Sequence, residues 1–222
     1  MAFTKVNTIR NIIDTRYDYI KKLINEYPSI KEAIIKEGER ECRRIAHDSA
    51  KGDLDVEATI YNQEISRYSD TEDLNNIFYQ SMLLIVYSYY ECIVGLLCKE
   101  VGAKQKIEAI CKYKDIELSE NTKENITFLD STVREIRNNI THNNAGTCKK
   151  GSIMKKISDK YPEIDFYEDT IGIYNSAFIL NALELEHNIL TELAADLGLK
   201  HKAEGNEWSV KLQEWSEKGK EQ

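Results

Sequence analysis

The chain has 222 residues, of which 41% are hydrophobic and 31% charged, with only two prolines and ten glycines. This balance excludes a disordered chain and is typical of a strongly helical globular protein that is long enough to bury a core. The formal net charge of −8 excludes a protein that coats nucleic acid through a uniformly basic surface. Five cysteines without a C-x-x-C pair indicate reduced thiols rather than a disulfide framework or a zinc site.

The first 68 residues are expected to form an N-terminal helical extension. Apolar residues recur every three or four positions over residues 6–27, which predicts one long amphipathic helix. Pro28 is predicted to end this helix. Ser29 and Glu32 have the spacing of a capping box, so a second helix is expected to begin there.

The next segments lead to the most apolar part of the chain. Residues 51–53, Lys-Gly-Asp, are predicted to break the second helix, and residues 55–68 predict a short third one. The run from Glu72 to Val101 is apolar on most faces and predicts a helix that other helices surround. Gly102 is placed to end it.

The centre of this core helix, residues 77–98, also has the length of a membrane span. Glu91 in its interior is costly in lipid, so we predict a buried core helix and no membrane. An unpaired carboxylate is also costly in a protein core, so Glu91 is expected to pair with an arginine or to face a polar cavity. The amphipathic N-terminus lacks the pattern of a secretory signal, which predicts a cytoplasmic protein.

The second half of the chain predicts two further strong helices. Asn121 and Glu124 have the form of a capping box before the first of them. Residues 143–174 predict loops and short elements, residues 175–197 the last long helix, and residues 200–222 a charged tail. The apolar seam of the first helix is formed by Ile126, Leu129, Val133, Ile136 and Ile140.

A polar motif stands at the end of this seam helix. Residues 134–144 read REIRNNITHNN, which places Arg137 and His142 five residues apart and Asn138 beside the arginine. On an ideal helix a step of five residues turns the side-chain direction by about 140°, so Arg137 and His142 would not share a face. We therefore expect His142 to lie where the helix frays into a loop. A structural interpretation is that the two side chains cap a helix end.

The order Arg137, Asn138, three variable positions and His142 resembles the R-x4-H motif of the HEPN ribonuclease superfamily, in which a polar residue commonly follows the arginine. The order of predicted helices matches that family over residues 70 to 198. The resemblance implies an all-α, up-and-down helical bundle at residues 69–199. It also implies a homodimer that brings two motifs together and metal-independent cleavage of RNA without a cofactor.

The chemistry of such cleavage agrees with these residue types. Attack of a ribose 2′-hydroxyl on the adjacent phosphate needs proton transfer and stabilisation of an anionic intermediate. A histidine such as His142, with a pKa near ~6.5, can act as base or acid, and the guanidinium of Arg137 can bind phosphate oxygens. Asn138 would orient the phosphate or the histidine. One histidine lacks a second proton carrier, which a two-fold dimer would supply.

Other residues are candidates for supporting roles. Arg134, Lys149 and Lys150 lie near the motif in the sequence and are expected to bind the RNA substrate. Glu91 is a candidate for the carboxylate that orients His142. No H-E-x-x-H pattern or recurring histidine spacing indicates a metal site, so we expect none.

The resemblance implies a toxin or antiviral-defence effector that an antitoxin or regulatory protein controls. In one HEPN toxin subfamily an antitoxin modifies a tyrosine two residues after the histidine, and this chain has Asn144 there. The main alternative is a non-catalytic HEPN-type module that binds a nucleotide or a protein partner. A third hypothesis is a structural adaptor that binds through the N-terminal seam.

Overall fold

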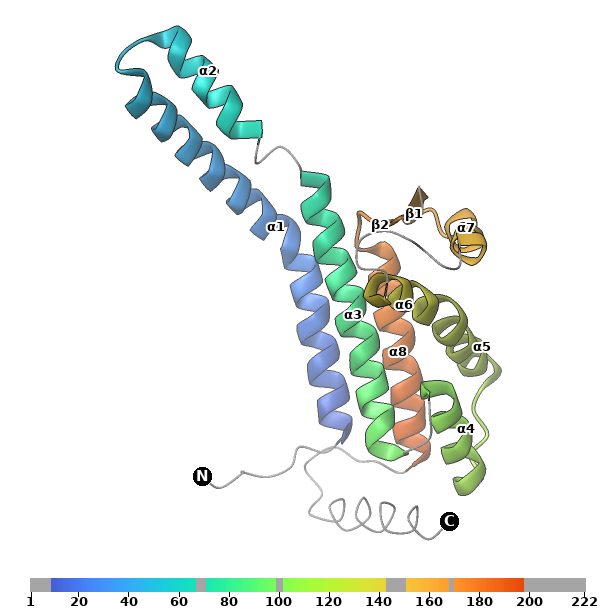
Figure 1. The fold of residues 1–222 in the computed structure, drawn as a ribbon. Coiled ribbons are helices and arrows are strands. Elements are labelled where there is room, and N and C mark those ends of the chain that lie inside the picture. Colours follow the sequence, from blue (N-terminus) through green and yellow to red (C-terminus); the bar gives the residue numbers. More distant parts are fainter. Residues whose placement is uncertain (1–8, 67–70, 99–101, 143–150, 168–169, 198–222) are drawn as a thin grey trace.

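The computed structural model describes residues 9–66, 71–98, 102–142, 151–167 and 170–197. These residues confirm the predicted all-α class, since the chain folds as a set of helices with one small hairpin (Figure 1). The elements in chain order are α1 (Ile9–Ala50), α2 (Leu54–Ile65), α3 (Thr71–Leu97), α4 (Ala103–Lys114), α5 (Glu120–Phe128), the π-helical turn η2 (Leu129–Val133), α6 (Arg134–His142), α7 (Gly151–Lys160), β1 (Ile164–Tyr167), β2 (Thr170–Ile173) and α8 (Ala177–Asp196).

The hydrophobic core lies where α3 packs against α8 and the first half of α1, which run alongside one another in Figure 1. Leu83 and Val86 of α3 and Ile179 and Leu193 of α8 are completely buried. Burial of one such side chain contributes about 1.5–3 kcal/mol to folding. By length and composition α3 could also cross a membrane, and 44% of the apolar window that meets this test is buried within the protein. The helix supplies core residues, as predicted, but the prediction that other helices surround it is wrong for one side, along which seven positions are exposed.

The helix α1 continues through Pro28 to Ala50, so the predicted helix end at Pro28 is wrong. An interior proline removes one helical hydrogen bond and costs about 3 kcal/mol. Packing against α3 offsets this cost on both sides of the proline. The ring of Tyr27 stacks on Phe78 with 3.7 Å between centroids, and one turn later Lys31 Nζ donates to Asn75 Oδ1 at 3.1 Å.

The predicted capping box at Ser29 and Glu32 is also wrong, because both residues lie inside α1. Glu32 instead accepts a hydrogen bond from Lys36 one turn later, at 2.6 Å. The predicted break at residues 51–53 is confirmed. The backbone there enters the left-handed region, with φ of +51° and +91° at the first two residues, and Asp53 caps the N-terminus of α2 through its side chain.

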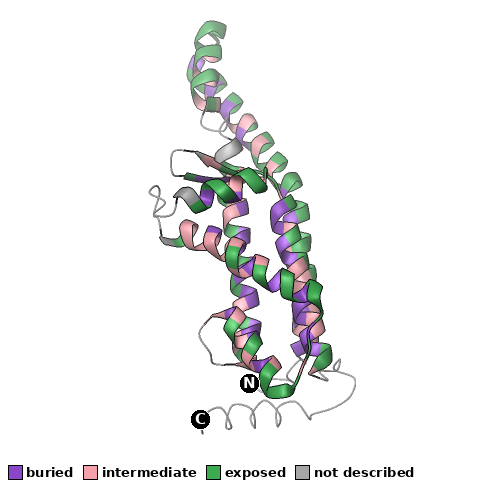
Figure 2. Cartoon of the chain, turned by 90° about the vertical axis from the view of Figure 1, so that its right-hand side faces the viewer, coloured by how far each residue is buried: buried purple, intermediate pink, exposed green. Residues whose placement is uncertain are grey.

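The predicted N-terminal extension is only partly separate from the bundle. Ile9, Ile13 and Ile24 of α1 are buried in the same core cluster as α3 and α8. Beyond Pro28, α1 and α2 form an arm that projects from the bundle (Figure 1) and that is largely exposed in Figure 2. The edge of the core therefore falls within α1 rather than at residue 68.

A further helix, α4, follows α3 and was not predicted. Gly102, which was predicted to end the core helix, instead stands at the start of α4. Gly102 is the N-cap of α4 and has a φ of +83°, a conformation that glycine adopts without a steric penalty. Ala103, Ile107 and Ile110 are buried at steps of four and three residues. The described part of α3 ends at Leu97, and residues 99–101 lie outside the described residues.

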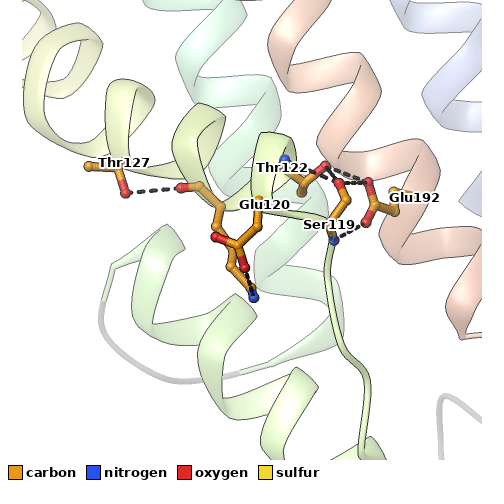
Figure 3. A network of polar contacts seen from close by, with 6 residues as sticks. Ser119, Glu120, Thr122, Thr127 and Glu192 are labelled. Carbon is orange, nitrogen blue, oxygen red and sulfur yellow. Dashed lines mark hydrogen bonds and ion pairs between the residues drawn. The ribbon is translucent and has the colours of Figure 1, made fainter.

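The helix α5 begins two residues earlier than predicted, because Ser119 rather than Asn121 is its N-cap. Figure 3 shows how a carboxylate of α8 binds this helix end. Glu192 accepts hydrogen bonds from the Ser119 backbone N–H at 2.7 Å, from the Ser119 hydroxyl at 3.1 Å and from the Thr122 hydroxyl. Negative charge at a helix N-terminus is favourable, so these bonds fix α5 against α8.

The segment before α8 contains short elements, as predicted. The helix α7 is followed by an antiparallel hairpin in which Ile164 pairs with Ile173. Two amides of α3 attach this hairpin to the bundle. Gln80 Nε2 donates to the Ile171 carbonyl at 2.7 Å, and the N–H of Ile173 donates to Asn76 Oδ1 at 2.9 Å. The predicted last helix is confirmed as α8, and the predicted tail lies outside the described residues.

Candidate functional site

The predicted apolar seam places the motif helix against the core. Ile126, Leu129, Val133 and Ile136 are buried, and Ile140 packs against the same core. This seam crosses from α5 to α6 through the π-helical turn η2. A π turn holds one residue more than an α turn and often occurs at functional sites.

Three predicted site residues meet at the contact of α6 with α3. Arg137 Nη2 lies 3.3 Å from Glu91 Oε2, and Arg137 Nη1 donates to Asn138 Oδ1 at 2.9 Å. The guanidinium carbon lies 5.8 Å from the centroid of the Tyr87 ring. The predicted pairing of Glu91 with an arginine is confirmed. The side chains of Arg137 and Glu91 are 28% and 34% exposed, so this guanidinium is held at the protein surface.

The position of His142 is described only at the level of its backbone, as the last residue of α6. The helix stays regular up to it, and Thr141 Oγ1 donates back to the Arg137 carbonyl at 2.9 Å. An ideal helix turns by about 140° between Arg137 and His142, so the backbone does not place them on one helix face. The His142 side chain and the two predicted lysines, Lys149 and Lys150, lie outside the described residues.

Arg134, the remaining predicted substrate-binding residue, forms an ion pair within its own segment. Its Nη1 lies 3.0 Å from Oδ1 of Asp130, four residues earlier on η2. The side chains are 35% and 20% exposed. Arg134 therefore links α6 to η2 through this ion pair, and its binding of RNA stays a prediction.

The structure also reveals a buried acid that the sequence analysis missed. Glu186 of α8 is completely buried, and neither carboxyl oxygen has a hydrogen-bond partner among the described residues. Burial raises the pKa of this carboxyl well above its usual range, and the negative charge of Glu91 raises it further. Its burial could have been predicted from its position, because Glu186 lies three or four residues from its neighbours in the apolar series of Ile179, Leu183, Leu190 and Leu193.

Tyrosine hydroxyls of α3 share this interior. Burial raises the pKa of Tyr87, and the charges of Glu91 and Asp130 raise it further. The Tyr90 hydroxyl is buried without a hydrogen-bond partner among the described residues, and burial together with Glu186 raises its pKa. Tyr87 and Tyr90 are thus core residues, and their hydroxyls are protonated at neutral pH.

Other features of the described residues do not add to this site. A cavity of about 520 Å³ lies between α4 and α5, lined by apolar residues such as Ile107, Leu118 and Ile126. Within the described ranges, no three side chains of His, Cys, Asp or Glu converge as metal ligands. The arrangement around Arg137 can bind an anion through its guanidinium, and Asn138 and Glu91 fix the guanidinium orientation.

Comparison of the chain with protein-family models, with curated proteins and with solved structures gives no match.

Proposed function

We propose that this protein is a metal-independent endoribonuclease that cleaves RNA through attack of a ribose 2′-hydroxyl on the adjacent phosphate. Arg137 and His142 are the catalytic residues, and Asn138 supports them. One observation carries the proposal. Arg137 is part-exposed and oriented by Asn138 and Glu91 on the short helix that ends at His142. The residue pattern resembles the HEPN motif, and the proposed setting is a cytoplasmic toxin or antiviral-defence effector.

The proposed roles follow from the chemistry of each group. The guanidinium of Arg137 stabilises the charge that develops on the phosphate, and the imidazole of His142 transfers a proton. Glu91 and Asn138 each occupy one terminal nitrogen of Arg137. A bound phosphate therefore competes with Glu91 for the guanidinium. Products should carry a 2′,3′-cyclic phosphate and a 5′-hydroxyl, and DNA should not be cleaved because it lacks the nucleophile.

A second copy of the chain is proposed to supply the second proton carrier. The outer side of α3 supports association, because seven exposed positions follow each other at steps of three or four residues and all are uncharged. Exposed apolar faces of this kind commonly bind other proteins. Glu91 lies on the same helix, beside this face. The seven positions are Leu74, Ile77, Ser81, Ile85, Ser88, Cys92 and Leu96.

The substrate is proposed to lie along the basic segment that follows the motif. Lys149 and Lys150 belong to it, and the structure shows Lys155, Lys156 and Lys160 exposed on α7. Lysine side chains attract the phosphate backbone of RNA without reading its sequence. A local basic segment also explains how a chain with a net charge of −8 binds RNA.

The second candidate function is a non-catalytic module that binds a nucleotide or a protein partner, such as an antitoxin or regulatory protein. The contacts of Arg137 favour this function. Its guanidinium already contacts a carboxylate, an amide and an aromatic ring, which is typical of an arginine that stabilises the fold and does not bind substrate. The two functions differ in whether RNA cleavage depends on His142.

The test compares wild type, Arg137→Ala and His142→Ala on total RNA in EDTA, with Arg44→Ala of the exposed arm as the matched control. We expect both motif variants to lose activity by about 100-fold or more and the control to keep it. Products are checked for cyclic phosphate ends. Equal activity in all four proteins contradicts the proposed site, and the absence of activity in wild type supports the binding module.

A further inference from the structure

Five ionisable side chains from four segments gather around Tyr87 in the interior. Four of them act on the pKa of the Tyr87 hydroxyl through their charges, and the fifth lies over the Tyr87 ring. These side chains are Glu91 on α3, Asp130 on η2, Arg134 and Arg137 on α6, and Glu186 on α8.

The charges of this cluster balance only in one protonation state. Arg137 pairs with Glu91 at 3.3 Å and Arg134 pairs with Asp130 at 3.0 Å, so two cations neutralise two carboxylates. Glu186 is the third acid. It is completely buried, and its oxygens have no hydrogen-bond partner within the described part of the chain. An ionised Glu186 would add an unpaired negative charge to a dry interior, which is strongly unfavourable.

The elements packed against α8 are α1, α3, α5 and η2, and each carries charged or polar groups. From α1, Arg10 and Asp14 are engaged with Thr191 and His187, on the neighbouring face of α8. From α5, the N-terminal hydroxyls bind Glu192. The charge that acts on Glu186 itself is that of Glu91 on α3. The charges of Arg16 and Asp14 on α1, Asp130 on η2 and Arg134 on α6 act on the tyrosines of α3 beside it.

We propose that Glu186 is a protonated carboxylic acid in the folded protein and that, by staying neutral, it keeps Arg137 at the surface in its pair with Glu91. Glu186 is then a positioning residue. Its loss of a proton would place a second carboxylate charge behind Glu91 and draw the guanidinium of Arg137 toward the interior. The proposed protonation state of Glu186 is inferred from its burial and from the charge balance of the cluster. Only an effect of Glu186 on RNA binding at Arg137 rests on the proposed function.

The first experiment is infrared spectroscopy of the carboxyl groups at neutral pH. Wild type should show the band of a protonated carboxylic acid, and Glu186→Gln should lack it. Glu184→Gln is the matched control, because Glu184 is an exposed carboxylate of the same helix that pairs with Lys21 outside this cluster, so its removal should leave the band in place. Identical spectra of wild type and Glu186→Gln would overturn the proposal.

The second experiment measures unfolding against pH for wild type and Glu186→Gln. The pKa of Glu186 is raised in the folded state, so its contribution to stability is fully present below the unfolded pKa near ~4.3. It is lost as the pH rises toward the folded pKa. The unfolding constant of wild type relative to the variant should therefore rise by up to about tenfold for each pH unit in that range. A ratio independent of pH would overturn the proposal. Glu186→Met, equally neutral and similar in length, repeats the test if the glutamine variant does not fold.

The positioning role needs a readout of Arg137 itself. Guanidinium proton and nitrogen resonances of Arg137, assigned by their loss in Arg137→Lys, should shift on raising the pH in wild type. In Glu186→Gln they should not shift. The same shift in both proteins would overturn the positioning role. None of these readouts uses RNA, so their failure is distinct from a failure of the proposed ribonuclease activity.

Discussion

The α1–α2 arm and the interior cluster around Tyr87 both contain opposite charges, but they use them differently. In the arm the ion pairs join residues three or four apart on one helix, such as Glu32 with Lys36 and Glu41 with Arg44, and all four side chains are well exposed. Such pairs contribute little, because water already solvates each charge. In the cluster one ion pair joins α6 to α3, the charged side chains are partly buried, and Glu186 behind them is completely buried. There the position and protonation of each side chain affect the others.

The largest expected effect comes from core packing. Leu83→Ala on α3 should lower the free energy of unfolding by about 2–5 kcal/mol, because it leaves a cavity in place of a completely buried side chain. Leu54→Ala is the matched control, since Leu54 at the start of α2 is 78% exposed. Denaturant unfolding of both variants measures the difference. Comparable losses would mean that the arm is packed as tightly as the bundle.

A smaller effect is expected at the contact of α8 with the N-terminus of α5. Burial opposes the charged form of Glu192, but its hydrogen bonds from Ser119 and Thr122 outweigh burial and lower its pKa. The contribution of Glu192 to the free energy of unfolding is therefore present above its unfolded pKa of about 4.3. It is lost as the pH falls through the pKa of the folded state. Glu192→Ala should cost about 1 kcal/mol at neutral pH.

The control for this variant is Glu120→Ala, which removes a highly exposed carboxylate from the first turn of the same helix. Unfolding is measured at neutral pH and at the acid limit for both variants. The difference between Glu192→Ala and wild type should disappear in acid. A difference that is constant with pH would assign the effect to lost packing instead of charge.

The smallest effect is expected in the arm. Arg44→Ala removes two ion pairs of α1, with Glu41 at 2.6 Å and Asp48 at 3.1 Å. Because all three side chains are exposed, the thermal midpoint should stay unchanged, and added salt should not alter the comparison with wild type. A clear loss of stability would show that the arm depends on its charge network as the cluster does.

The sequence predicted the elements whose own residues determine them. The apolar seams of α3, of α5 to α6 and of α8 repeat at helical spacing, so these helices were found close to their true bounds. The path of α1 through Pro28 was not predictable in this way. It depends on Tyr27 stacking against Phe78, a residue 51 positions later in the chain. Long-range contacts override local signals, and a single sequence does not display them.

The candidate site shows the same division. The motif of Arg137, Asn138 and His142 could be read directly, and the expected arginine partner of Glu91 is present. Glu186 was missed because a glutamate inside a helix reads as a solvated residue unless its face is known. Its place in the seam of α8 becomes meaningful only when α3 is seen to cover it.

The π-helical turn η2 makes the direction of Arg137 sensitive to the length of the chain. Because η2 holds one residue more than an α turn, it is equivalent to a single-residue insertion in the helix that leads to the motif. Deleting one residue there, such as the exposed Ser131, would restore a regular helix and rotate α6 by about 100°. Arg137 would then turn away from Glu91 although no residue of the motif had changed. The separation between α5 and the motif is thus a determinant of the site, as much as the identity of the motif residues.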